Sequence, residues 1–385
     1  MTKLTDAGIL GKDPLDSKIG PPHYPSRSDS SRWLWSRLAL GLSPTPLPGL
    51  LLIAGLVIGP SGVNLLSRNT LVYLDPAVSA ALAALGVLIG LGFDIRRPGE
   101  VQLLGAATVE AALVLVLVGA GVLWAAIQPA PTASTWLMAG VLGICASASS
   151  TLAVPDSASS DSLATRIGDL DDVLPIVLGG VMLAAIREAT PAMVTWLTVQ
   201  SIGLAVAIAY GAWLLVDQSS SESEQRVFTI GAVLLLGGAA EFLSMSALWM
   251  GLVAGFVWNL ARGHARERIA TEIRYMQHPL VVLLLLIAGA RAGFSTPVGV
   301  LIVVYTALRL IGKLAGGRLV RRMISTELPS QFGLLLISPG VIAVAFALNV
   351  QNANANAAGE FLSIVVGGSI ISELISRLMR SRIEP

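Results

Sequence analysis

Two adjacent aspartates in an apolar stretch are the residues of this chain best suited to chemistry. They are Asp171 and Asp172, within Leu170-Asp-Asp-Val-Leu174. Neighbouring residues of a helix point about 100° apart, so one carboxylate can face a cavity while the other packs against a neighbouring helix. Like charges at this range oppose simultaneous ionisation. Such a pair can therefore hold a proton in one state and a monovalent metal ion, Na⁺ or K⁺, in another.

A simpler interpretation places the same residues at a membrane surface. Asp169, Asp171 and Asp172 would then occupy the first turns of a helix and complement its dipole. The polar stretch Ser159–Gly168 supports this alternative. A helix that starts near Leu163 would instead bury the two aspartates about two turns deep. The sequence leaves both placements open.

Two basic residues lie inside a later apolar segment, where an unpaired charge is costly. Arg309 lies deep within Val303–Gly312, and we expect it to have a carboxylate partner. Asp171 and Asp172 are the obvious candidates. Lys313 follows one turn later on the same helix face. Its long side chain is expected to reach the surface.

Hydroxyl groups and a Pro-Gly pair mark two segments as interrupted helices. Ser149, Ser150 and Thr151 end a run of small residues, and Ser338-Pro-Gly340 lies in the middle of a later segment. Pro removes a backbone donor and Gly weakens a helix. Paired interrupted helices in corresponding positions of two halves are typical of the central site of a transporter. The alternative is that these small residues only pack helices together.

The remaining reactive residues indicate no enzyme and no cofactor. Glu110 and Glu241 fall in apolar segments, and each is interpreted as an accessory carboxylate or a helix-packing residue. Cys145 is the single cysteine and the three histidines are scattered, so neither a disulfide nor a Cys/His metal cluster is expected. The chain also has no Gly-x-Ser-x-Gly elbow and no metal-binding His/Glu motif.

The composition predicts an all-α polytopic membrane protein surrounded by lipid. Hydrophobic residues make up 54% of the 385 residues and charged residues 13%, whereas a soluble domain has about 25% charged residues. The mean hydropathy is +0.75. The formal net charge is only +1, so the chain lacks the basic surface that a nucleic-acid-binding protein needs.

Twelve segments qualify as spans, some of them marginally, since a helix needs about 20 mostly apolar residues to cross a bilayer. With the N-terminus inside, most loop arginines fall on the cytoplasmic side, as the positive-inside rule requires. We therefore expect both termini in the cytoplasm and the chain in the cell (inner) membrane. The predicted spans are 49–67, 76–95, 101–127, 135–155, 165–187, 191–216, 226–243, 245–261, 277–293, 296–317, 331–350 and 358–378.

These spans are expected to form one transmembrane domain over residues 49–380. The first repeat covers 49–187 and the second covers 245–378, with linker helices over 191–243 between them. The two five-helix repeats would have opposite orientations in the membrane. The interrupted spans four and eleven then occupy corresponding positions.

The N-terminal residues 1–48 differ from the rest of the chain in being polar. They lack the apolar stretch of about 7–15 residues that a secretory signal contains. We expect a disordered cytoplasmic tail. Within it, Arg32–Leu42 is aromatic, basic and too short to span, which favours an interfacial helix on the membrane surface.

Five short motifs follow one another between residues 49 and 380. They are Gly55–Leu66, Val87–Arg97, Ser149–Ala153, Leu170–Leu174 and Met250–Gly255. In order and spacing they resemble motifs of the cation:proton antiporters of the sodium/hydrogen exchanger superfamily, in particular the paired-aspartate type with the bacterial Na⁺/H⁺ antiporter fold.

The resemblance implies two inverted five-helix repeats, crossed interrupted helices four and eleven, and a homodimer. It implies an elevator-like exchange of Na⁺, K⁺ or Li⁺ for H⁺ at a midplane site. Asp172 would bind the cation or the proton. Asp171 would pair with a basic residue, for which Arg309 is the first candidate and Lys313 the second charge partner. The oxygens near the ion would come from Ser149, Ser150 and Thr151.

The sequence departs from that family at two places, and these keep alternatives open. Gly92 stands where the family often has a glutamate, and Ser338–Val341 lacks the charges of the usual Pro-Arg-Gly-Glu stretch. One alternative is an organic-anion/sodium carrier of related fold, for which Arg309 and Lys313 would be the basic groups. The other is a non-transporting sensor or subunit that keeps the fold.

Overall fold

The computed structural model describes most of the chain after residue 47, and its regular elements there are all helices. The predicted tail and interfacial helix fall in residues 1–47, outside the described residues. The described ranges are 48–93, 99–125, 133–149, 166–188, 190–261, 264–294, 296–324, 332–337, 340–353 and 355–380.

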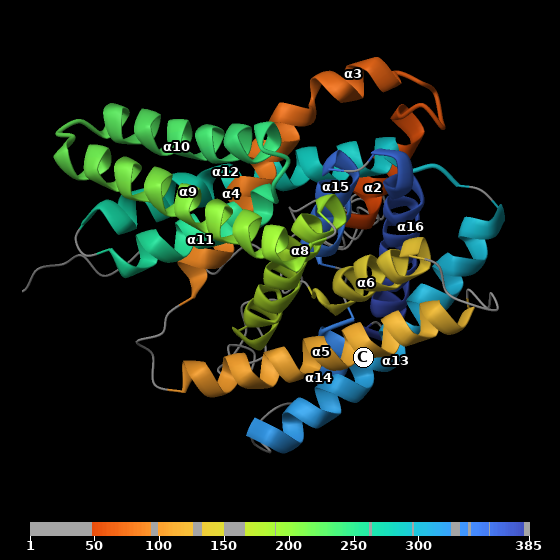
Figure 1. Cartoon of the computed structure of the whole chain (residues 1–385). Helices are drawn as coiled ribbons and strands as arrows, with labels where there is room; N and C mark the ends of the chain where they lie inside the picture. The colour runs from red at the N-terminus through yellow and green to blue at the C-terminus, as the bar shows by residue number, and fades with distance from the viewer. Residues whose placement is uncertain are drawn as a thin grey trace, which may run out of the picture. The chain divides into compact units, whose positions relative to one another are not determined.

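The helices follow one another along the chain (Figure 1). They are α2 (Pro48–Ile58), α3 (Arg68–Tyr73), α4 (Asp75–Gly92), α5 (Glu100–Ala125), α6 (Ala133–Ser147), α8 (Val173–Arg187), α9 (Pro191–Gln218), α10 (Glu222–Phe242), α11 (Ala247–Leu260), α12 (His264–Arg291), α13 (Thr296–Ile324), α14 (Phe332–Leu335), α15 (Val341–Ala353) and α16 (Ala355–Arg380).

These helices have the lengths and compositions of a multi-pass membrane protein. Within the described residues, seven helices are long and apolar enough to cross a membrane, and four shorter apolar helices accompany them. Each of the twelve predicted spans contains a helix or part of one. The prediction of an all-α polytopic membrane protein is confirmed. The division into two inverted repeats stays a prediction.

Two helix boundaries differ from the sequence prediction. α2 ends at Ile58, well before residue 67, because Pro60 lacks a backbone donor and a turn with Asn64 at φ 58° follows. α12 begins at His264, well before residue 277, because a charged segment continues the helix beyond the apolar part. Hydropathy locates the apolar part of a helix and not its ends.

Glycines allow α4 and α11 to pack at very short range. A Cβ atom added at Gly86 would collide with the backbone of Leu248, and one at Gly251 would collide with the backbone of Ala83. Small residues of this kind are typical of helix pairs in lipid, where close backbone approach supplies the packing energy. α4 is thereby fixed against α11, and it forms one wall of the cavity described below.

A second close pair, α5 and α13, lies side by side (Figure 1). A Cβ atom at Gly312 would lie 3.2 Å from Val114 Cγ2, and one at Gly316 would lie 2.7 Å from Glu110 Cγ. The two glycines flank Lys313 at helical spacing. They bring α5 near enough for the Glu110 side chain to reach that lysine.

Both predicted helix interruptions are present. α6 ends at Ser147, inside the fourth predicted span, and a turn follows α14 before α15 starts at Val341. The two breaks touch each other, because a Cβ atom at Gly340 would lie 2.8 Å from the Ser149 carbonyl oxygen. Glycine is therefore the residue that fits this contact. Ser150, Thr151, Ser338 and Pro339 lie outside the described residues.

Candidate functional site

Arg309 binds three backbone carbonyls next to the two helix breaks. Its guanidinium donates to the carbonyls of Ala146 (3.2 Å), Ala148 (3.0 Å) and Ile337 (3.0 Å). The side chain is only 2% exposed. A cation suits this place because the carboxyl end of a helix carries partial negative charge. Arg309 thus ties the end of α6 to the turn after α14.

Lys313 is completely buried, so the prediction that it reaches the surface is wrong. Its Nζ donates to the Ser147 carbonyl (2.5 Å), Ser149 Oγ (2.6 Å), Asp171 Oδ2 (2.9 Å) and Glu110 Oε2 (3.2 Å). The close packing of α5 on α13 covers the lysine and supplies one of its two carboxylates. We call Lys313, Asp171, Glu110 and Ser149 the lysine cluster.

The pairing implied by the family resemblance also needs correction. Arg309 was the first expected partner of Asp171 and Lys313 the second, and the ion pair described for Asp171 is with Lys313. Both basic residues lie on one face of α13, one turn apart, so the sequence could not distinguish them. The structure distinguishes the two residues, because the guanidinium of Arg309 donates to carbonyls at the broken helix ends instead of pairing with Asp171.

The two aspartates have different surroundings, as adjacent positions on a helix allow. Asp171 is 1% exposed and accepts a hydrogen bond of 2.5 Å from Ser149 Oγ in addition to the lysine. Asp172 is 8% exposed and lines a cavity. Asp172 is the N-cap residue of α8, so both aspartates are buried near the start of a helix, and their depth in a membrane stays a prediction. Of the three acidic residues in this stretch, Asp169 is the one that is exposed.

The cavity next to Asp172 has a volume of about 380 Å³ and is half polar in character. Asp172, Ser149 and Asp169 line it, and so does Arg166, from the same segment as the aspartates. α12 contributes Arg266, Arg274 and Gln277. The remaining lining residues are Leu85, Leu88, Ile89, Leu91, Gly92, Phe93, Leu170, Val173, Val341 and Ile342. A hydrated monovalent ion has ample room in this volume.

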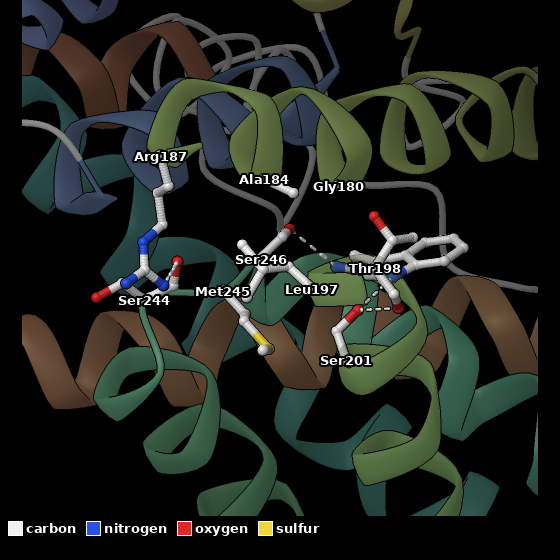
Figure 2. A pocket seen from close by; sticks show the side chains of 10 residues that line it. Gly180, Ala184, Arg187, Leu197, Thr198, Ser201, Ser244, Met245 and Ser246 are labelled. Carbon is white, nitrogen blue, oxygen red and sulfur yellow. Dashed lines mark hydrogen bonds between the residues drawn. The ribbon is translucent and has the colours of Figure 1, made fainter. Parts of the chain in front are cut away.

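The opposite end of α8, at Arg187, is tightly closed. The residues there enclose only about 10 Å³, roughly the space that one water needs. Figure 2 shows Arg187 directed at the loop before α11, where its Nη1 donates to the carbonyls of Leu243 and Ser244. The Trp249 ring packs against Gly180, where a Cβ atom would lie 2.7 Å from its Cγ. We call this region the closed end.

A buried hydrogen bond further joins α15 to α11 at the closed end. Asn349 Nδ2 donates to Ser246 Oγ at 2.6 Å. The same oxygen caps α11 by accepting from the Trp249 backbone N–H, and Trp249 Nε1 donates to Ser201 of α9. Three helices are thus held together through two serines and one tryptophan.

Glu110 is the member of the lysine cluster to which sequence reasoning gave least weight. It is 1% exposed, its Oε2 contacts Lys313, and its Oε1 has no hydrogen-bond partner. The glycines around Lys313 gave a signal for a close helix contact, but they did not identify the helix. Glu241, the other accessory candidate, lies in α10 and is half-buried.

The oxygen-rich surroundings of Asp172 suit a monovalent metal ion as a substrate. Sodium and potassium bind oxygen ligands, and a carboxylate with nearby hydroxyl or carbonyl oxygens supplies them. Among the described residues there is no group of three or more His, Cys, Asp or Glu side chains that could hold a metal ion.

Comparisons with known proteins place the fold. The sequence matches no protein-family model and no curated protein. The structure is similar to that of the sodium proton antiporter MjNhaP1 from Methanocaldococcus jannaschii at pH 8, with a TM-score of 0.63 and 16% sequence identity. The match covers 91% of this chain and 96% of that chain. The chain therefore has the fold of a sodium/proton antiporter.

Proposed function

We propose that the protein exchanges a monovalent cation, Na⁺ or K⁺, for protons across a membrane by alternating access to Asp172. The observation that carries this proposal is the difference between the two aspartates. Asp171 is buried against Lys313, whereas Asp172 faces the cavity. No ion pair of the described residues involves Asp172, so its carboxylate is available to a proton or to a cation.

Competition for one carboxylate is the basis of the exchange. A proton and a metal ion cannot occupy the same oxygens of Asp172 together, so the arrival of one releases the other. A buried carboxylate strongly disfavours the unpaired, charged state. The site therefore moves across the membrane only when it is loaded, and this couples the two flows.

The cavity and the closed end represent one state of the alternating cycle. Asp172 is reached from the side on which the amino end of α12 lies, while the hydrogen bonds of Arg187 and Asn349 hold the other side shut. We infer that the open side is the cytoplasm, that both termini lie there, and that the protein acts as a homodimer in the cell membrane. It would be a transporter and not an enzyme.

The oxygen ligands of the cation are proposed to come from Asp172 and from the segment that follows α6. Ser149 lines the cavity, although its hydroxyl is already engaged by Asp171 and Lys313. Its backbone N–H donates to Asp172. Ser150 and Thr151, which lie outside the described residues, keep their predicted role as further ligands.

Proton flux in proteoliposomes tests the proposal. Na⁺ or K⁺ added to vesicles that contain the wild-type protein and a pH-sensitive dye should change the internal pH. Asp172→Asn should abolish the response, because an amide neither titrates nor binds a cation as a charge. Asp217→Asn, the same change at the exposed end of α9, should leave the flux unchanged. A wild-type protein that responds to neither cation from acid to alkaline pH would overturn the exchange.

An organic-anion/sodium carrier is the second candidate, because three arginines line the cavity. Arg166 is paired with Glu100, but Arg266 and Arg274 add positive charge to the border, which attracts anions. The same vesicles distinguish the two functions. An anion carrier would take up a labelled carboxylate with sodium and ignore a proton gradient. If neither flux appears, a non-transporting sensor remains.

A further inference from the structure

We propose that Glu110 retains the proton of Lys313 inside the protein throughout the cycle, so that one proton is exchanged for each cation. This inference rests on the proposed exchange at Asp172 and sets its stoichiometry. Two protons per cation would require a second group that releases a proton when the cation binds. Lys313, next to Asp171, is the natural source of that second proton, and Glu110 is the residue that holds the proton back.

The hydrogen bonds around Lys313 favour a protonated amine. An ammonium group has three N–H donors, whereas a neutral amine has two donors and a lone pair that needs a donor opposite it. The Ser147 carbonyl can only accept, and Ser149 donates its own hydrogen to Asp171. A neutral amine would therefore direct its lone pair at acceptors, which is unfavourable in a site without water.

Only a protonated carboxyl group could donate to a neutral amine, and both carboxyl groups next to Lys313, of Asp171 and Glu110, are buried. A protonated Glu110 could donate to a neutral amine across the 3.2 Å that separates Oε2 from Nζ. In that state the proton has left the nitrogen and formed an O–H bond on Glu110. It has not reached the cavity, because Glu110 and Lys313 are 1% and 0% exposed. The number of protons in the lysine cluster is unchanged.

The charges of the site are balanced in both loaded states. Three buried carboxylates, of Asp171, Asp172 and Glu110, face the two cations Arg309 and Lys313. One negative charge is in excess, and a single proton or a single monovalent cation at Asp172 neutralises it. Without the carboxylate of Glu110 the site would carry an excess positive charge after cation binding. Loss of the Lys313 proton would then restore neutrality.

The packing of α5 on α13 supports a specific role for this glutamate. Glu110 lies opposite Gly316, where a Cβ atom would be 2.7 Å from Glu110 Cγ and 3.1 Å from Oε1. The absence of a side chain at Gly316 leaves the carboxylate the room it occupies beside Lys313. A methyl group at this position would push the carboxylate away from the lysine, which provides a second way to perturb the contact.

The test compares wild type, Glu110→Gln and Glu110→Asp in proteoliposomes with an imposed membrane potential. Exchange of two protons per cation moves net charge, so that a potential of about 60 mV shifts the equilibrium cation gradient about tenfold. Exchange of one proton gives no shift. We expect no shift for wild type and for Glu110→Asp, and a shift approaching tenfold for Glu110→Gln. Glu241→Gln removes a carboxylate outside the lysine cluster and should behave as wild type.

Each outcome decides between the proposals. Wild-type flux that shifts with potential overturns the role of Glu110, and so does a folded Glu110→Gln variant that shows no flux or no shift. If Glu110→Gln does not fold, Gly316→Ala replaces it and should show the same potential dependence. Absence of any cation-driven proton flux in wild type would overturn the proposed function itself, which is a different result.

Discussion

Replacement of Lys313 by methionine tests whether the lysine cluster is the charged centre of the fold. Methionine keeps an unbranched side chain of similar length and removes the ammonium. Loss of one partner from a buried ion pair costs about 3–5 kcal/mol. Because Asp171 and Glu110 both lose their contact with Lys313, we expect the upper end of that range, about 5 kcal/mol. The Ser147 carbonyl and the Ser149 hydroxyl lose a donor as well.

Thermal unfolding in detergent micelles, followed by tryptophan fluorescence, provides the assay. Lys313→Met should unfold at a much lower temperature than wild type. Arg318→Met is the matched control, since Arg318 is an exposed residue of the same helix and such changes stay within about 0.5 kcal/mol. The double variant Lys313→Met/Asp171→Asn should be more stable than Lys313→Met alone, because contacting residues are not additive.

Two results would refute the reasoning about Lys313. If Lys313→Met unfolds together with Arg318→Met, the ammonium does not stabilise the fold. If the double variant loses the sum of the two single losses, Asp171 and Lys313 are not energetically coupled, whatever their 2.9 Å separation.

Three further predictions concern packing, the helix breaks and the closed end. Gly251→Ala should lower the free energy of unfolding by about 1–3 kcal/mol, because its methyl group meets a neighbouring backbone. Gly231→Ala, with open space around it, should raise the free energy of unfolding by about 0.4–1 kcal/mol. Melting curves of both variants test this difference. Arg309→Met leaves three buried carbonyls unpaired at about 1–3 kcal/mol each, so little folded protein should survive size-exclusion chromatography, and a wild-type yield would contradict this. Asn349→Leu removes the buried hydrogen bond to α11 and should loosen the closed end. A cysteine placed at Ala184 should then react with a water-soluble thiol reagent up to about tenfold faster than it does when Asn349 is present. Equal rates would show that this bond does not hold the closed end.

The sequence was sufficient to locate the helices and the two breaks, because these depend on local properties. Long apolar runs predict spans, and Ser338-Pro-Gly340 falls where α14 gives way to α15. The same local rules misplaced helix ends such as that of α2 at Ile58. A turn after a helix and a charged extension before one do not change the hydropathy of the span between them.

The sequence also indicated that Arg309 needed a carboxylate partner, since a bilayer excludes unpaired charge. It did not determine which partner each basic residue would have. Lys313 meets Asp171 across 142 residues and Glu110 across 203, and such distances carry no periodic signal. Only the tertiary structure decided these pairs. Close packing at Gly316 places Glu110 next to Lys313. Arg309 binds the carbonyls of the broken helices. Asp171 therefore pairs with Lys313, and Asp172 faces the cavity.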